Sequence, residues 1–97
     1  MKGRSDPEDV LIRFFGSTSR ARILTLLFGN EELSFYQRQI MFESGLSLQT
    51  VQRELRNLVE IGIVSKHEAD NRVYYQVNGH SSFFNALKEI CRLMGSK

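Results

Sequence analysis

The segment from Gln37 to Tyr75 constrains the fold of this chain more than any other part of the sequence. Its pattern predicts a short helix, a turn at Gly45, an amphipathic helix over 47–61 and a β-hairpin over 63–77. Two helices joined by a tight turn are typical of the helix-turn-helix motif, whose second helix lies in the major groove of DNA. The segment therefore predicts a helix and a hairpin presented together to a duplex.

The predicted helix over 47–61 has two distinct faces. Ser47 is a suitable N-cap, and Gly62 ends the helix. Apolar side chains recur on one face, which predicts burial of Leu48, Val51, Leu55 and Leu58. The opposite face is polar and consists of Gln49, Arg53, Arg56 and Glu60, flanked by Gln52 and Asn57.

Three more helices and a short strand are expected around this segment. Asp6 before Pro7 begins a helix over 7–15, because proline at the first helical position sacrifices no hydrogen bond. A second helix begins at Ser17-Thr18, ends at Gly29 and buries Ala21, Leu24, Leu27 and Phe28. Leu33 to Tyr36 is rich in β-formers and predicts a short strand, and serines cap a last helix over 82–94.

The expected fold is mainly α with a small β-hairpin wing. Its order is helix, helix, short strand, helix, helix, two hairpin strands and helix, with Ala69-Asp70-Asn71 at the hairpin turn. At 97 residues the chain fits one domain, residues 1–97.

The two terminal helices carry more apolar residues than one core needs. In the last helix Phe83, Leu87, Ile90 and Met94 follow the a/d spacing of a helix that pairs with another, with Phe84 and Cys91 beside them. Doubled aromatics at Phe14-Phe15 and Phe83-Phe84 leave one ring of each pair outside the core. We therefore expect helices 7–15 and 82–94 to form the interface of a homodimer.

Net charge does not by itself indicate a nucleic-acid partner. The chain has 13 basic and 11 acidic residues, and between Gln37 and Arg72 five basic side chains are matched by five acidic ones. A positive surface must therefore come from arrangement. The helical wheel puts Glu54 toward the buried flank of its helix and Glu60 at the far end, so the field at residues 49–56 stays positive.

Other classes of function find no support in the sequence. Cys91 is the single cysteine, and His67 and His80 lack partners at metal-ligand spacing, so no disulfide and no metal site are expected. No nucleophile-base pair, paired carboxylates or glycine-rich phosphate loop appears, so we expect no enzyme activity and no cofactor. No apolar run approaches the roughly 20 residues of a membrane span, and the polar amino end is unlike a signal peptide, which favours the cytoplasm.

The polar helix face carries side chains of the types that can read bases. Arg53 and Arg56 each offer a donor fork to guanine or phosphate, and Gln49 and Gln52 match the edge of adenine. A solvated surface helix would show a similar face, so the neighbouring turn and hairpin are what favour DNA. The hairpin adds three basic side chains, Lys66, His67 and Arg72, with Glu68 and Asp70 opposing them.

Three blocks of residues carry a family resemblance. They are Gly16 to Leu24, then Ser44 to Ser47 with Thr50-Val51, Arg53 to Leu55 and Leu58 to Val64, and finally Arg72 to Tyr75. With these blocks the chain resembles the ArsR-like winged helix-turn-helix transcriptional regulators over roughly residues 10–93. Arg-Ala-Arg-Ile-Leu at 20–24, Gln52 to Leu55 and Phe83-Phe84 also look like the winged-helix domains found ahead of nucleotidyltransferase domains. The chain ends at Lys97, which predicts a freestanding regulator.

The resemblance implies a dimer that binds palindromic double-stranded DNA. It also implies which residues face DNA on the helix and on the hairpin, namely Ser47, Gln49, Thr50, Gln52, Arg53, Arg56, Lys66 and Arg72. Metal-sensing members carry cysteines in or near the recognition segment, and this chain has none there, so no metal is expected. Nothing in the sequence identifies a small-molecule effector.

A second hypothesis is a winged-helix module that binds a protein, including a separate catalytic protein, without direct DNA binding. The balanced charge of the motif region motivates it. Ion pairs from Arg53 and Arg56 to Glu54 or Glu60 would favour this alternative, because they would remove the positive face.

Overall fold

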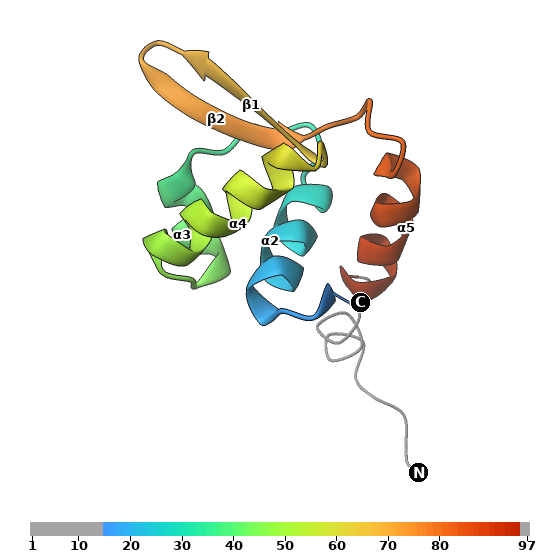
Figure 1. The fold of residues 1–97 in the computed structure, drawn as a ribbon. Coiled ribbons are helices and arrows are strands. Elements are labelled where there is room, and N and C mark those ends of the chain that lie inside the picture. The colour runs from blue at the N-terminus through green and yellow to red at the C-terminus, as the bar shows by residue number, and fades with distance from the viewer. Residues whose placement is uncertain (1–14, 96–97) are drawn as a thin grey trace.

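The computed structural model describes residues 15–95, with side chains through Leu93, and contains four helices and a two-stranded hairpin (Figure 1). Most of the helix expected over 7–15 lies outside the described residues, and Phe15, its last residue, is helical. No helix among the described residues is long and apolar enough to cross a membrane. In chain order the elements are α2 (Thr18–Phe28), α3 (Gln37–Ser44), α4 (Leu48–Glu60), β1 (Val64–Ala69), β2 (Arg72–Val77) and α5 (Phe84–Gly95).

Helix α2 occupies the centre of the fold. Ser17 accepts the Arg20 backbone N–H at 3.1 Å through its side-chain oxygen, which confirms the predicted N-cap. The helix packs against α3, α4 and α5, so that α3 and α4 lie on one side of it and α5 on the other (Figure 1). The predicted stripe is buried, together with a residue outside it, and the whole set is Ala21, Ile23, Leu24, Leu27 and Phe28.

The turn between α3 and α4 follows the sequence prediction. Gly45 has φ +73°, a left-handed conformation that lacks steric cost only for glycine. Its N–H closes the end of α3 by donating to the Met41 carbonyl at 3.0 Å. Ser47 caps α4 by accepting the Thr50 N–H at 3.2 Å. The turn thereby fixes the helix-turn-helix geometry.

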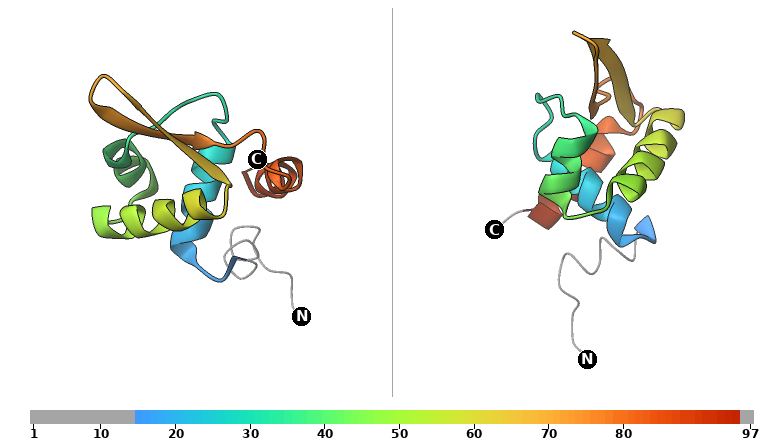
Figure 2. Two further views of the ribbon diagram at one scale, coloured as in Figure 1. Left: turned by 45° about the horizontal axis from the view of Figure 1, so that its top comes forward. Right: turned by 90° about the vertical axis from the view of Figure 1, so that its left-hand side faces the viewer.

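Strands β1 and β2 pair antiparallel over six residues each, with Val64 opposite Val77 and Ala69 opposite Arg72. Asp70 and Asn71 both have positive φ, 53° and 64°, as a two-residue type I′ hairpin turn requires. Aspartate and asparagine tolerate this conformation better than other non-glycine residues. The hairpin extends away from the helices as a wing (Figure 2).

The strand expected from Leu33 to Tyr36 is reduced to one antiparallel bridge. Phe35 and Tyr75 exchange backbone hydrogen bonds of 2.8 and 2.7 Å, and no second pair follows. The reason is local, because Tyr36 is already the N-cap of α3 and its N–H donates to the Gln39 side chain at 3.1 Å. The chain turns into a helix before a second ladder pair can form.

Helix α5 begins two residues later than predicted, because residues 81–83 form a bend and turn, with the Phe84 N–H donating to the Ser81 carbonyl. This shifts the predicted apolar stripe. Phe83 is 60% exposed, whereas Phe84 packs on Phe28 with ring centroids 5.8 Å apart. Cys91 joins the same buried surface at 4% exposure.

Burial of Cys91 raises the pKa of its thiol to about 11 from an ordinary 9.0. At pH 8 we therefore expect about 100-fold less thiolate than an unperturbed cysteine would have, and correspondingly slow labelling by a disulfide reagent. Denatured protein should label at the ordinary rate. Equal rates for native and denatured chains would contradict the packing of α5 on α2.

Candidate nucleic-acid interface

The outer face of α4 is a continuous polar surface. Burial of Val51, Leu55 and Leu58 on the opposite side leaves this face in solvent. Five of its side chains are exposed, and they are Gln49, Gln52, Arg53, Arg56 and Glu60. The helical wheel inferred from the sequence therefore holds in the structure, although Leu48 at the amino end is only half-buried.

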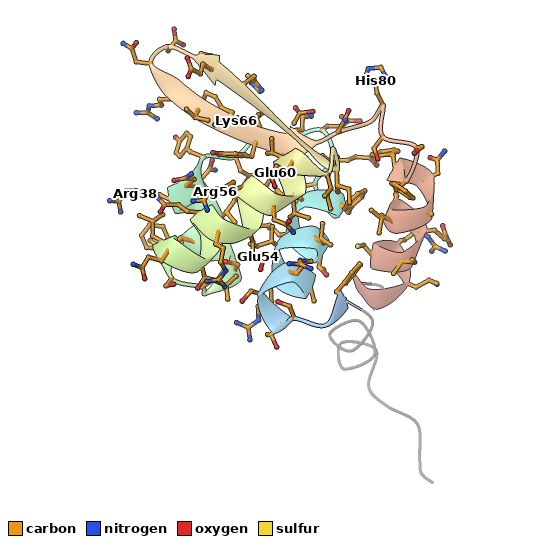
Figure 3. The ribbon with its side chains drawn as sticks, viewed as in Figure 1. Arg38, Glu54, Arg56, Glu60, Lys66 and His80 are labelled. Carbon is orange, nitrogen blue, oxygen red and sulfur yellow. The ribbon has the colours of Figure 1, made fainter. Side chains whose placement is uncertain are left out.

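The acidic side chain in the middle of α4 is withdrawn from this face. Glu54 is 5% exposed, and its carboxylate oxygen lies 2.8 Å from the Nε of Arg20 on α2. Figure 3 shows Glu54 on the α2 side of α4. Because Arg20 neutralises Glu54 away from solvent, Glu54 does not offset the charge of Arg53 and Arg56. Glu60, one turn after Arg56, is the acidic side chain of α4 that stays on the outer face.

Arg53 and Arg56 form no ion pair with any residue in the described part of the chain; the three pairs there are Arg20–Glu54, Glu31–Lys88 and Glu89–Arg92. Glu60 is exposed at the carboxyl end of α4 (Figure 3) and likewise pairs with neither arginine. The ion pairs that would have favoured the protein-binding alternative are therefore not formed.

Ser47 and Thr50 use part of their hydrogen-bonding capacity to cap the amino end of α4. The Ser47 hydroxyl accepts the Thr50 N–H and donates to the Thr50 hydroxyl oxygen at 2.9 Å. The Thr50 hydroxyl proton stays available to an outside acceptor. Gln49, one residue earlier, is exposed, and its side chain makes no hydrogen bond within the described residues.

Gln52 is tied to the wing through a second glutamine. Its amide nitrogen donates to the Oε1 of Gln37 at 3.2 Å, and the Nε2 of Gln37 donates to the phenol oxygen of Tyr75 at 3.1 Å. These bonds connect β2, the first residue of α3 and the outer face of α4.

Both predicted wing residues, Lys66 and Arg72, are exposed. The Arg72 guanidinium lies 5.0 Å from the centre of the Tyr36 ring, a cation–π contact that holds the side chain beside α3. Tyr36 in turn packs against Tyr74, with ring centroids 5.4 Å apart, and Tyr74 stacks on His67, with ring centroids 5.6 Å apart. The wing is thus joined to the start of α3 by side chains as well as by the backbone bridge.

A groove of about 580 Å³ lies between the wing and the start of α3. Its lining contains three cations, Arg38, Lys66 and Arg72, and no carboxylate. An adjoining groove of about 300 Å³ continues toward α4 and is lined by Arg56, Lys66 and Glu60, among others. Figure 3 shows Arg38, Arg56 and Lys66 near the junction of α3, α4 and the hairpin.

Arg38 and Gln37 were not among the residues predicted to face DNA. They are the first two residues of α3, for which the sequence predicted only the helix that precedes the turn at Gly45. The available signal in the sequence was their position in the first turn of the first helix of the helix-turn-helix motif. That position places them in the candidate interface only because the fold brings the wing next to α3.

The described residues contain no group of three or more histidine, cysteine, aspartate or glutamate side chains placed to hold a metal ion. The grooves beside the wing also lack histidine and cysteine in their lining.

Two solved structures are similar to this chain. Reduced HlyU from Vibrio cholerae superposes with a TM-score of 0.67 at 23% sequence identity, over 94% of this chain and 90% of that one. A homodimeric winged helix-turn-helix DNA-binding domain from Mycobacterium bovis, a possible ArsR-family transcriptional regulator, superposes with a TM-score of 0.57. Its identity is 24%, over 97% of this chain and 83% of that one.

The chain has a winged helix-turn-helix fold. The resemblance to ArsR-like regulators that the sequence indicated is confirmed at the level of this fold. No protein-family model and no curated protein matches the sequence. The residue assignments on the winged helix therefore depend on the geometry described above.

The Arg20–Glu54 pair provides a direct test of this geometry. Replacing Glu54 with glutamine removes the charge that pairs with Arg20 at a buried position, and we expect the free energy of unfolding to fall by about 1–2 kcal/mol. The loss is limited because Arg20 is one-third exposed and solvent screens the pair. Glu60→Gln is the matched control on the same helix and should change stability by less than about 0.5 kcal/mol. Chemical denaturation measures both, and equal values for the two variants would contradict the pairing.

Proposed function

We propose that this protein is a homodimeric, sequence-specific DNA-binding regulator of transcription that acts in the cytoplasm. The observation that carries the proposal is the outer face of α4, on which Gln49, Arg53 and Arg56 are exposed while Glu54 is turned inward to Arg20. In this proposal α4 enters the major groove, where arginine and glutamine side chains distinguish base pairs.

The wing contacts the flanking DNA backbone in this arrangement. Lys66, Arg72 and Arg38 line one groove without a carboxylate, so this surface matches a phosphate backbone in charge. The aromatic contacts of Arg72 and the hydrogen bonds of Gln37 hold the wing against the helix-turn-helix unit. Backbone contacts of this kind orient α4 but carry little sequence information.

Dimerisation through the terminal helices is part of the proposal. One side of α5 packs on α2, while Phe83 and Leu93 remain 60% and 57% exposed. Phe83 directly precedes α5 and Leu93 lies near its end, and large exposed apolar side chains at such a terminal helix suit a second copy of the chain. The similar domain from Mycobacterium bovis is homodimeric. Two copies would place two α4 helices on half-sites about one helical turn apart.

Selection from a randomised duplex library tests the proposal. We expect the wild-type chain to enrich an inverted repeat. Its affinity should fall steeply as salt rises, because the arginine and lysine side chains release counterions from the DNA phosphates on binding, and this release is less favourable at high salt. Enrichment of no sequence, together with affinity insensitive to salt, would overturn it. Capture of a protein partner in the absence of DNA would then favour the protein-binding alternative.

Arg53 is predicted to read a base. Arg53→Ala should weaken binding to the selected site by about 1–3 kcal/mol and relax the preference at one base pair in each half-site. Competition binding with singly substituted duplexes measures this effect. An equal loss on every duplex would instead assign Arg53 to the backbone.

Arg38 is predicted to contact phosphate. Arg38→Ala should weaken binding to all duplexes to a similar extent and lower the slope of log affinity against log salt by about 1 per contact. Sequence preference should be unchanged, which separates this variant from Arg53→Ala. An unaltered salt slope would show that Arg38 does not reach the DNA.

A further inference from the structure

We infer that Gln52 reads an adenine, and that Gln37 and Tyr75 act as positioning residues that hold its side-chain amide in one orientation. The inference rests on the proposed function and deepens it by naming the base that one position of α4 recognises. The observation behind it is the hydrogen-bonded chain from Tyr75 through Gln37 to Gln52, called the amide relay below.

The relay begins at a fixed point. Tyr75 is 5% exposed and is paired through its backbone with Phe35 in both directions, at 2.7 and 2.8 Å. On its other side it lies opposite Lys66 in the hairpin. Its phenol oxygen is therefore held in place, and it accepts a hydrogen bond from Gln37, which follows Phe35 by two residues.

Gln37 carries this positional constraint to the surface. It is half-buried at the start of α3, and its donor to Tyr75 sets the direction in which its own oxygen points. That oxygen accepts one N–H of Gln52 at 3.2 Å. Gln52 itself is exposed on the face that includes Arg53 and Arg56. A long flexible side chain is thus ordered before any ligand binds, which reduces the entropy lost on binding.

The relay also decides which hydrogen-bonding groups remain for DNA. A glutamine amide has two N–H donors and one oxygen acceptor. With one N–H directed to Gln37, one donor and one acceptor are left. In the major groove adenine presents an acceptor at N7 and a donor at N6, which this pair matches. Guanine presents two acceptors, and its O6 would face the Gln52 oxygen without a hydrogen bond.

A double-mutant experiment on the full chain tests the inference. A binding site is first selected from a randomised duplex library, and the position in it at which Gln52→Ala no longer discriminates between base pairs is identified. Affinities are then measured for four duplexes that carry each of the four base pairs at that position. We expect the wild type to prefer A·T there by about 10-fold or more. Gln37→Ala should reduce this preference to within about 3-fold, and Gln37→Ala with Gln52→Ala should be no worse than Gln52→Ala alone.

Two further variants separate positioning from stability. Gln39→Ala removes an amide from the same helix, one that accepts the Tyr36 N–H and forms no hydrogen bond with Gln52, so the A·T preference should persist even if the protein is less stable. Tyr75→Phe removes only the hydroxyl that anchors the relay. It should lower the A·T preference while leaving the preferences at other positions unchanged.

Three results would overturn the inference while leaving DNA binding intact. They are an A·T preference that survives Gln37→Ala, a loss of affinity that is equal at all base pairs, and a wild-type preference for G·C at this position. The last would mean that both N–H groups face the groove. Failure of the wild type to select any sequence would instead overturn the proposed function, and the inference with it.

Discussion

Packing of α4 on α2 is the interaction on which the rest of the surface depends. A helix is rigid, so burying Val51, Leu55 and Leu58 on one side determines which side chains reach solvent on the other. The same packing brings Glu54 to Arg20 and removes its charge from the outer face. A segment whose formal charge sums to zero thereby presents, on one side, two arginines that have no ion-pair partner among the described residues.

A second constraint is the single backbone bridge between Phe35 and Tyr75. It attaches the wing to the start of α3 and sets Tyr36 and Gln37 beside β2, where they contact Arg72 and the Tyr75 hydroxyl. The cationic groove follows from this attachment, because Arg38 belongs to α3 whereas Lys66 and Arg72 belong to the hairpin. If the hairpin were not attached to α3 by this bridge, Arg38, Lys66 and Arg72 would not line the same groove.

Local signals were sufficient for most of the fold. The N-caps Ser17 and Ser47, the left-handed Gly45 and the Asp70-Asn71 turn act within a few residues, so a sequence pattern predicts them well. The predicted strand at 33–36 is only a single bridge in the structure, because β-propensity competes there with the start of α3. The tertiary position of the segment decides which of the two forms.

The candidate site was less predictable because it depends on contacts between distant segments. The helical wheel located the faces of α4 and the inward position of Glu54, but its partner Arg20 lies 34 residues away. Gln37 and Arg38 border the candidate interface only because the wing returns to α3. The sequence indicated that one ring of Phe83-Phe84 lies outside the core but not which one, since two adjacent phenylalanines leave the phase of a short helix ambiguous. In the structure Phe84 packs on Phe28 and Phe83 is exposed.

Chemical-shift mapping with a selected duplex tests the account most directly. Backbone amide signals of the full chain would be followed in a heteronuclear NMR titration with DNA, against a scrambled duplex as control. If α4 and the wing bind DNA, the largest changes will occur at Gln49 to Arg56, at the start of α3 and along the wing strands near Lys66 and Arg72. Changes centred on the exposed face of α5, or no changes at DNA concentrations that saturate binding, would contradict it.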